Sequence, residues 1–188
     1  MGVIFVSGNL AMDYVGTLHE RFAARAEQLR APGDLGRWLV AAGLLDTAPG
    51  VSAAQLDEAV GLRETMFAVI AREIDGRGGP TADERAQINA AASHAPPVPV
   101  LSADARVAHV GDLAAGLSAV ARDAIALFER TDGSVLKWCA DDACTHPFLD
   151  RSRGHRRRWC DMGGCGDRAK AAAYRARQRQ SATPTGTA

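Results

Sequence analysis

Residues 139–165 read CADDACTHPFLDRSRGHRRRWCDMGGC, and this stretch decides how the C-terminal part of the chain folds. It holds all four cysteines of the 188 residues, in the spacing C-x4-C-x15-C-x4-C. Two close cysteine pairs joined by a loop are typical of tetrahedral zinc, because each pair supplies two thiolates from one turn. We therefore expect one Zn²⁺ ion, with four ligands: Cys139, Cys144, Cys160 and Cys165. Four thiolates leave no coordination position open, so the predicted zinc is structural rather than catalytic.

The apolar residues around these cysteines are too few to form a core that folds alone. Zinc binding contributes roughly 10–16 kcal/mol in zinc-finger peptides, which is enough to fold such a segment. Three alternatives stay open: disulfides in an oxidising compartment, an iron–sulfur cluster, and zinc release on oxidation. His146 and His155 also lie near enough in the sequence to replace a cysteine as ligand.

The charge of the chain is unevenly distributed, although its formal net charge is zero. Residues 1–136 carry 11 arginines and 17 acidic residues, whereas residues 137–180 carry 11 basic and five acidic residues. A basic segment of this kind indicates a nucleic-acid contact, because arginine matches phosphate oxygens and guanine edges. The alternatives are a solvated charged face, or attraction between the two halves of the chain. The candidate nucleic-acid-binding residues are Arg151, Arg153, Arg156, Arg157, Arg158, Arg168, Lys170, Arg175, Arg177 and Arg179.

The chain before the cysteines shows mostly helical patterns. We expect a short strand in FVSG (5–8), a helix that begins after Asn9 and includes Leu18, and a helix over 34–45 capped by Asp34. Ser52 begins a longer helix, and Thr81 with Glu84 forms a capping box for the next one. The segments 94–102 and 105–110 predict a β-hairpin, and Asp112 caps a helix that ends before the TDG of 131–133.

The predicted organisation is a helical domain over 1–133, a zinc module over 134–180 and a disordered tail over 181–188. The predicted fold class is α+β: a mostly helical N-terminal domain with a small hairpin, then a treble-clef-like or hairpin-type zinc module. A last helix is expected from about 164 to 180. On its helical wheel, the alanine stripe of Ala169, Ala173 and Ala176 lies between two arginine-bearing sides. We expect that stripe to pack on the zinc turn.

Other features suggest no further chemistry. We interpret Asp13, Thr17, His19 and Glu20 as the polar face of a helix, with the lining of a pocket in the N-terminal domain as the alternative. We interpret Arg63 as a side chain that extends to solvent. Trp38 and Trp138 are expected in the core, and Trp159 against the metal turn. The chain shows no catalytic motif, no leader peptide and no long apolar run, so we expect a cytoplasmic protein that is neither an enzyme nor membrane-bound.

The C-terminal stretch resembles the CGNR-type zinc finger in Cys139, Cys144, FLDRSR (148–153), RRRWC (156–160) and CGDRAKAAAYRAR (165–177). The N-terminal region resembles the ABATE domain, which precedes that finger in a family of stress-related bacterial transcription regulators. This likeness rests on GNLAMDYVGTL (8–18) and DLGRWLVAAGLL (34–45). The chain has Asp167 where the naming motif has Asn, and Gly16-Thr17 where the family commonly has Asn-Thr.

The resemblance implies DNA binding and transcriptional control. Our hypothesis adds that the N-terminal domain binds a small-molecule effector or forms a homodimer. RNA binding is one alternative, because phosphate contacts alone do not distinguish the two polymers. A protein–protein zinc adaptor and an enzyme targeted by its finger are the others.

Overall fold

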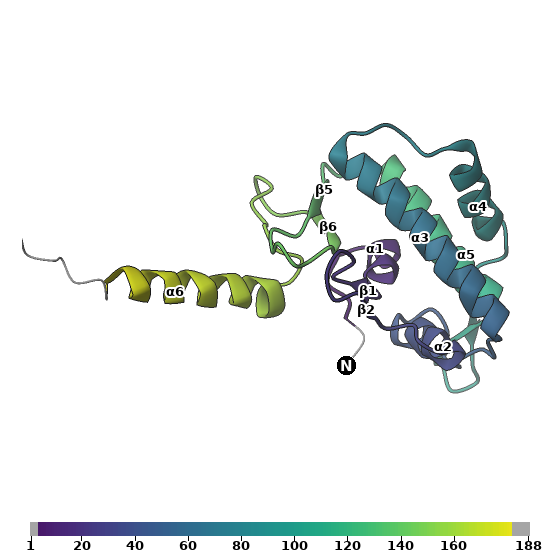
Figure 1. Ribbon diagram of the computed structural model, residues 1–188. Helices are drawn as coiled ribbons and strands as arrows, with labels where there is room; N and C mark the ends of the chain where they lie inside the picture. The colour runs from purple at the N-terminus through teal and green to yellow at the C-terminus, as the bar shows by residue number, and fades with distance from the viewer. Residues whose placement is uncertain (1–3, 182–188) are drawn as a thin grey trace, which may run out of the picture.

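The structure is a computed structural model that describes residues 4–181 (Figure 1). Within these residues it is mostly helical, with three antiparallel two-stranded sheets. The first elements are α1 (Leu10–Val15), β1 (Leu18–His19), β2 (Ala26–Glu27), α2 (Pro32–Ala41), α3 (Ala53–Asp75) and α4 (Ala82–Ala92). The later elements are β3 (Val98–Leu101), β4 (Val107–Val110), α5 (Leu113–Glu129), β5 (Val135–Trp138), β6 (Pro147–Asp150), the π-helical turn η1 (Met162–Gly166) and α6 (Asp167–Ser181). This confirms the predicted α+β class, including a hairpin followed by a helix in the zinc module.

The helical body is built around α3 and α5, and α5 lies behind α3 in Figure 1. The short α1 packs against both of them, α4 packs against both from another side, and α2 packs against α3. The core that they enclose includes Trp38, Tyr14, Met66 and Ile70, all essentially inaccessible to solvent. The Tyr14 hydroxyl donates to the Ala59 carbonyl at 2.8 Å, so this buried polar group is satisfied. Trp38 therefore lies in the core as predicted.

Local capping signals place most helix starts where the sequence predicts them. The side chains of Asn9, Ser52, Thr81 and Asp112 each accept a hydrogen bond from a backbone amide in the first turn of the following helix. α3 ends at Gly76, whose φ of 63° is a left-handed conformation that costs glycine little. These caps act over three or four residues, which is why the sequence alone reveals them.

Three local predictions for the N-terminal region are wrong. Residues 5–8 form no strand, because the amides of Val6 and Ser7 instead donate to the Asp13 carboxylate at 2.9 Å. α1 stops at Val15, and Leu18 pairs with Glu27 in the β1–β2 ladder. α2 begins at Pro32, so Asp34 lies in its first turn, where its carboxylate accepts from the Ala31 amide at 2.7 Å.

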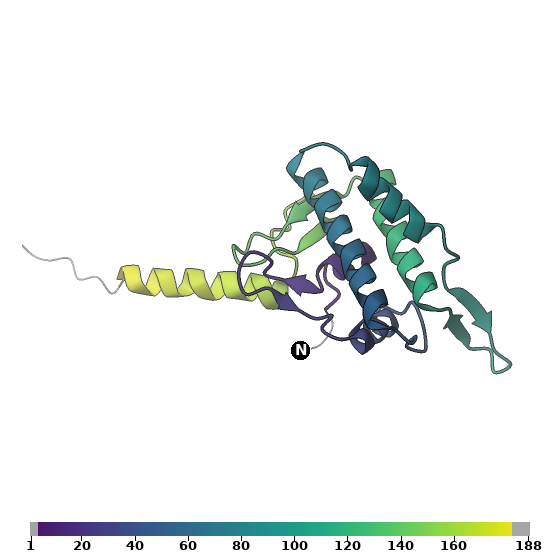
Figure 2. The same cartoon turned by 45° about the vertical axis from the view of Figure 1, so that its right-hand side comes forward.

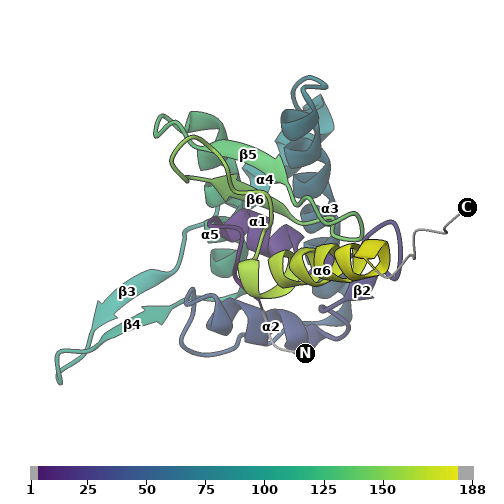
Figure 3. The same ribbon diagram turned by 90° about the vertical axis from the view of Figure 1, so that its left-hand side faces the viewer.

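Two elements project from the body in directions that differ clearly in Figures 2 and 3. One is the β3–β4 hairpin, and the other is α6, which extends away from the zinc module. The alanine stripe of α6 packs on no zinc turn: Ala173 is exposed, and Ala169 and Ala176 are only half-buried. That prediction is wrong, because the helix continues in line past the module instead of folding back on it.

Two further predictions concern the ends of the chain and the membrane. The disordered tail over 181–188 lies outside the described residues, apart from Ser181 at the end of α6. Among the helices of the described part, none combines the length and the apolar character that crossing a membrane would need.

Candidate metal centre and basic surface

The four predicted ligands come together in the fold. One sulfur atom from each of Cys139, Cys144, Cys160 and Cys165 lies within 4.8 Å of all the others, and they form the metal-ligand cluster that the described residues contain. The Sγ–Sγ distances of Cys144 to Cys160 and of Cys160 to Cys165 are both 3.7 Å. A tetrahedron with Zn–S bonds of about 2.3 Å has edges of about 3.8 Å, so the spacing fits one zinc ion. Disulfide bonds need about 2.05 Å, and all four cysteines are free.

Two tight turns bring the cysteine pairs together. Cys139 follows β5 directly, and its amide donates to the His146 carbonyl at 3.1 Å across the hairpin. The Cys144 amide donates to the Asp141 carbonyl at 2.8 Å and so closes the first turn. In the second turn Asp161 caps η1, and the Gly166 amide donates back to the Asp161 carbonyl at 2.9 Å. Each turn therefore orients two sulfur atoms toward one centre.

The electrostatics of the cluster also favour a bound cation. Contact with the Cys139 sulfur raises the pKa of the Cys160 thiol, and burial raises the pKa of Cys165. Four thiolates in this space therefore need a compensating positive charge, which Zn²⁺ supplies. Arg168 adds a second positive charge, since its Nη2 donates to the Cys165 sulfur at 2.9 Å. Its Nε donates to the Asp141 carboxylate at 2.8 Å, which joins the start of α6 to the first turn.

Neither histidine near the cysteines belongs to the cluster. His155 is exposed, and its Nδ1 lies 3.3 Å from the Asp150 carbonyl. His146 is buried and stacks on His19, with ring centroids 5.9 Å apart. Within the described residues the Nε2 of His146 has no hydrogen-bond partner, and burial lowers the pKa of this ring to about 4. We therefore assign the four zinc ligands to cysteine alone.

His19 and Glu20 line a pocket of about 320 Å³ together with three of the ligand cysteines. Asp13 and Thr17 are buried. The interpretation of these four residues as a helix's polar face is therefore wrong. The spacing of the four residues is helical, but α1 ends at Val15. His19 and Glu20 lie beyond that end and face the zinc module instead.

The loop after β6 is held by a buried carboxylate. The Asp150 side chain is inaccessible and accepts from Lys137 Nζ at 2.8 Å and from the Ser152 amide at 2.9 Å. Burial opposes its ionisation, but the hydrogen bonds from Lys137 and Ser152 hold the pKa of Asp150 at about 2. Lys137 also donates to the carbonyls of His155 and Arg157. One lysine thus fixes the strand end and the arginine-rich loop together.

The zinc module is joined to the N-terminal segment by hydrogen bonds to the backbone carbonyls of residues 6–8. The Leu149 amide donates to the Ser7 carbonyl at 2.8 Å, and Arg157 Nη2 donates to the Val6 carbonyl at 2.7 Å. Arg151 Nη1 donates to the Gly8 carbonyl at 2.8 Å. On the other side of β5, the Trp138 indole donates to Asp75 at 2.8 Å. Trp138 is thus a half-buried contact with the end of α3 rather than a core residue, whereas Trp159 packs against the cysteines as predicted.

A buried ion pair secures the loop that faces the module. Arg63 of α3 is only 1% exposed, so its expected extension to solvent is wrong. Its guanidinium donates to both carboxylate oxygens of Glu27 at 2.7 Å and to Thr17 Oγ1 at 3.0 Å. Glu64 accepts from Arg63 and from Arg21. This network pins residues 16–28 to α3, and no local pattern could reveal it because the partners lie 36 and 46 residues apart.

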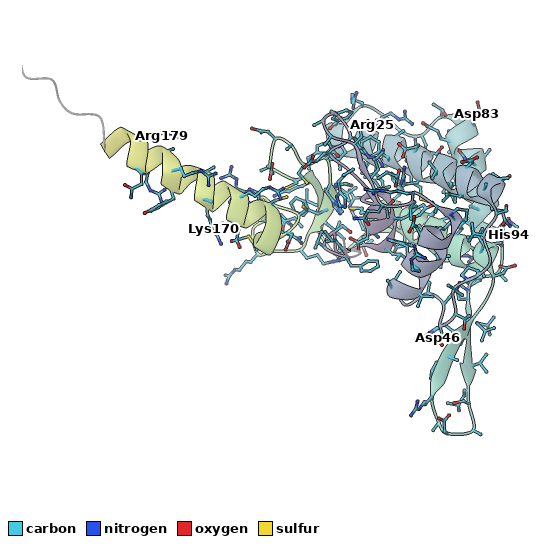
Figure 4. The ribbon with its side chains drawn as sticks, turned by 60° about the horizontal axis from the view of Figure 1, so that its bottom comes forward. Arg25, Asp46, Asp83, His94, Lys170 and Arg179 are labelled. Atoms are coloured by element: carbon cyan, nitrogen blue, oxygen red, sulfur yellow. The ribbon has the colours of Figure 1, made fainter. Side chains whose placement is uncertain are left out.

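The predicted nucleic-acid-binding residues divide into two groups. Arg157 and Arg168 spend their donors inside the protein: Arg157 also donates to the carbonyls of Trp159 and Cys160, and Arg168 contacts Asp141 and Cys165. Asp167 pairs with Lys170 at 3.0 Å rather than with Arg168. Arg168 is nevertheless exposed, and so are the other eight candidates: Arg151, Arg153, Arg156, Arg158, Lys170, Arg175, Arg177 and Arg179. Figure 4 shows Lys170 and Arg179 on α6, well away from the helical body.

Comparison with known families agrees with this architecture. Residues 8–131 match the ABATE family model, described as "Putative stress-induced transcription regulator". Residues 136–178 match the CGNR zinc finger, and no curated protein matches the chain. Because the first match covers more than half of the chain, and the second contains all four clustered cysteines, the chain belongs to the ABATE family and carries a C-terminal CGNR zinc finger with one structural zinc site.

Proposed function

We propose that this protein is a cytoplasmic DNA-binding transcription regulator, whose α6 and arginine-rich loop contact duplex DNA. The single observation that carries the proposal is that α6 projects from the zinc module with its cationic side chains exposed (Figure 1). The zinc site holds the start of that helix, and the proposal assigns binding rather than catalysis to the chain. A reducing cytoplasm suits the four free cysteines.

The charge pattern of α6 matches the major groove of DNA. At 100° per residue, Arg175 and Arg179 lie on one flank of the helix, beside the internally bonded Arg168, and Lys170 and Arg177 lie on the opposite flank. An α-helix with its side chains is about 10–12 Å across, and the major groove of B-DNA is about 12 Å wide. Cations on two opposite flanks can therefore reach the phosphates on both walls of the groove.

The alanine stripe between these flanks faces the groove floor in this arrangement. Ala169, Ala173 and Ala176 are small enough to let the helix approach the base edges closely. Tyr174 and Gln178, which hydrogen-bond to each other at 3.1 Å, then face solvent. Duplex RNA has a deep, narrow major groove that side chains cannot read, so the arrangement favours DNA over RNA.

The loop over 151–158 adds phosphate contacts beside the helix. Arg153 and Arg156 are exposed, and Arg158 stacks over the Trp159 ring at 5.0 Å. The Lys137–Asp150 pair fixes this loop, so the cations are presented without ordering a flexible segment on binding. Arg157 supports the loop from inside and is a positioning residue in this proposal.

Fluorescence anisotropy with a labelled duplex, measured over a range of salt concentrations, tests the proposal. Arg175→Ala and Arg177→Ala should each weaken binding and lower the slope of log K against log salt by about one. Arg37→Ala is the matched control, because Arg37 is an exposed arginine of α2, outside the zinc module. Arg157→Ala should lower stability while leaving the salt slope unchanged.

Two further measurements separate the alternatives. Ala173→Glu should abolish binding by placing a carboxylate at the groove floor, whereas Tyr174→Ala should have little effect. Unlabelled duplex RNA should compete more weakly than duplex DNA at the same salt concentration. Equal competition would favour RNA recognition, and no affinity for either polymer would favour a protein–protein adaptor.

A further inference from the structure

The β3–β4 hairpin is an apolar arm that nothing in the described chain covers. We call residues 98–110 the arm. Its two faces carry large apolar side chains with exposed fractions between 44% and 73%: Val98, Val100, Leu101, Val107 and Val110. An isolated two-stranded hairpin is only marginally stable in water and usually needs a packing partner. Exposed apolar surface of this kind marks a site of protein association.

The two edges of the arm are obstructed to strand addition near its base. The Ser102 amide donates to the Arg106 carbonyl at 2.9 Å, and the alternation of an antiparallel ladder then turns the backbone groups of residues 99, 101, 107 and 109 outward. Pro99 has no amide to donate on its edge. The outward amide and carbonyl of His109 both bind Asp46, at 2.7 and 3.1 Å, and Figure 4 shows Asp46 beside the arm. Near the base, a partner must therefore contact the side-chain faces of the arm.

The tip of the arm is ordered although it projects. The Ser102 hydroxyl contacts Asp104, donates to the Arg106 carbonyl at 2.9 Å and accepts from the Arg106 amide at 3.1 Å. Asp104 and Arg106 also form an ion pair at 3.1 Å. A preorganised tip loses little conformational entropy when it binds.

A groove that suits the arm opens at the arm's own base. It has a volume of about 580 Å³ and lies between α3, α4 and the start of α5. Ala59, Leu62, Leu113 and Leu117 give it apolar walls, and Glu58, Gln87 and His94 add polar groups at its sides. A smaller hollow of about 370 Å³ lies against Val98 and Val110 and shares Ala114 with the groove. The arm and the groove are therefore neighbours on one side of the molecule.

We propose that two copies of the chain form a two-fold symmetric dimer, in which the arm of each copy lies in the groove of the other. Two arms that lie antiparallel bring each tip to the other's base, which is where the groove opens. Each chain thus carries both the arm and the groove, and a two-fold axis forms the two equivalent arm-in-groove contacts at once. The arm and α6 project in different directions (Figure 2), so the dimer leaves both copies of α6 uncovered.

Sedimentation velocity of the full zinc-loaded chain, from about 1 to about 100 µM, tests the dimer. The wild-type chain should be dimeric at the upper concentrations. The double variant Val100→Lys/Leu101→Lys places a charge on each face of the arm, and it should raise the dissociation constant at least about tenfold. Both residues are exposed in the single chain, so the fold should not change. Phe22→Lys is the matched control: Phe22 is 86% exposed but lies outside the arm, and its variant should remain dimeric.

A groove variant tests where the arm lies. Ala114→Glu adds bulk and charge to the groove, while a carboxylate in the first turn of α5 suits the fold. It should weaken the dimer as much as the arm variant does. A mixture of the two variants keeps one intact arm and one intact groove, so it should associate more tightly than either variant alone.

Three results would overturn the proposal. If the wild-type chain stays monomeric, the arm would instead bind a different protein and the groove a small-molecule effector. An arm variant that remains dimeric would place the interface elsewhere. A groove variant that remains dimeric, or a mixture that shows no recovery, would replace the arm-in-groove contact with one between two arms.

Discussion

The substitution Gly16→Ala probes how the zinc module is seated on the helical body. A Cβ atom on Gly16 would lie 2.0 Å from Cε1 and 2.5 Å from Nδ1 of His146. Ordinary carbon contacts are about 3.5–4.0 Å, so the imidazole ring would have to retreat by roughly 1.5 Å. The ring has little room to do so, because it is buried, stacks on His19, and has Nε2 3.9 Å from the Asp13 carboxylate.

The expected magnitude follows from two opposing effects. Overpacking a buried site costs about 1–3 kcal/mol. Gly16 has φ −69° and ψ −7°, which alanine adopts readily, so the backbone effect alone would stabilise the fold by about 0.4–1 kcal/mol. We therefore expect Gly16→Ala to lower the free energy of unfolding by about 1–2 kcal/mol. In a His146→Ala background the clash is gone, and the same change should raise stability, which gives a coupling energy of about 1–3 kcal/mol.

Guanidinium unfolding at saturating zinc measures this double-mutant cycle. Tryptophan fluorescence reports on both parts of the chain, since Trp38 lies in the body and Trp138 and Trp159 in the zinc module. A chromophoric chelator should also withdraw zinc faster from Gly16→Ala than from the wild type. If Gly16→Ala proves neutral or stabilising while His146 is present, the proposed packing of the module on α1 is wrong.

The remaining predictions address the buried ion pair, pH and the metal. Glu27→Ala leaves the Arg63 charge buried without its bidentate partner and should cost about 3–5 kcal/mol of unfolding free energy. Arg37→Ala removes an exposed ion pair and should cost at most about 1 kcal/mol. Equal losses would show that burial of the Arg63–Glu27 pair does not matter for stability. Hydrogen bonds from Arg72 and Thr81 lower the pKa of Glu84 from 4.5 to about 2, so its contribution to stability is present above pH 4.5 and is lost as pH falls through about 2. Glu84→Gln should therefore flatten the fall in Tm over that range, and a slope identical to that of the wild type would refute the assignment. Cys144→Ser or chelation should remove zinc and unfold residues 137–180. Amide hydrogen exchange at residues 6–8 should also become faster, because these residues hydrogen-bond to the module. Unchanged metal content and unchanged spectra would argue against the zinc site.

The elements that the sequence predicts well depend on contacts within a few residues. Ser52 with Gln55 and Thr81 with Glu84 form capping boxes inside one helical turn, and both helices begin where expected. The cysteine spacing indicates zinc for a related reason, because each pair closes its own short turn. The sequence predicted that the first helix continues past Val15 to include Leu18, and this is wrong. The helical spacing of Leu18 carries no information about the zinc module, which residues 16–28 face in the fold.

The basic surface shows the same division between local and distant information. Composition alone identified ten cations in residues 150–180, but it could not show which of them are engaged inside the protein. Arg157 is held by the Val6 carbonyl, 151 residues away, and Arg168 by Asp141, 27 residues away. The alanine stripe of α6 suggested packing, yet the path of the chain after Cys165 leaves the stripe without a partner to pack on within the described residues.

The amino-acid sequence by itself determined most of the helix caps, the hairpin, the zinc ligands and the uneven charge, because each depends on side chains and amides that are close along the chain. Only the tertiary structure decided that Arg63 is buried, that His146 rather than an added side chain fills the space beside Gly16, and that α6 and the arm stand free of the body. These outcomes depend on which distant surfaces exclude water from one another, and that is settled when the segments pack.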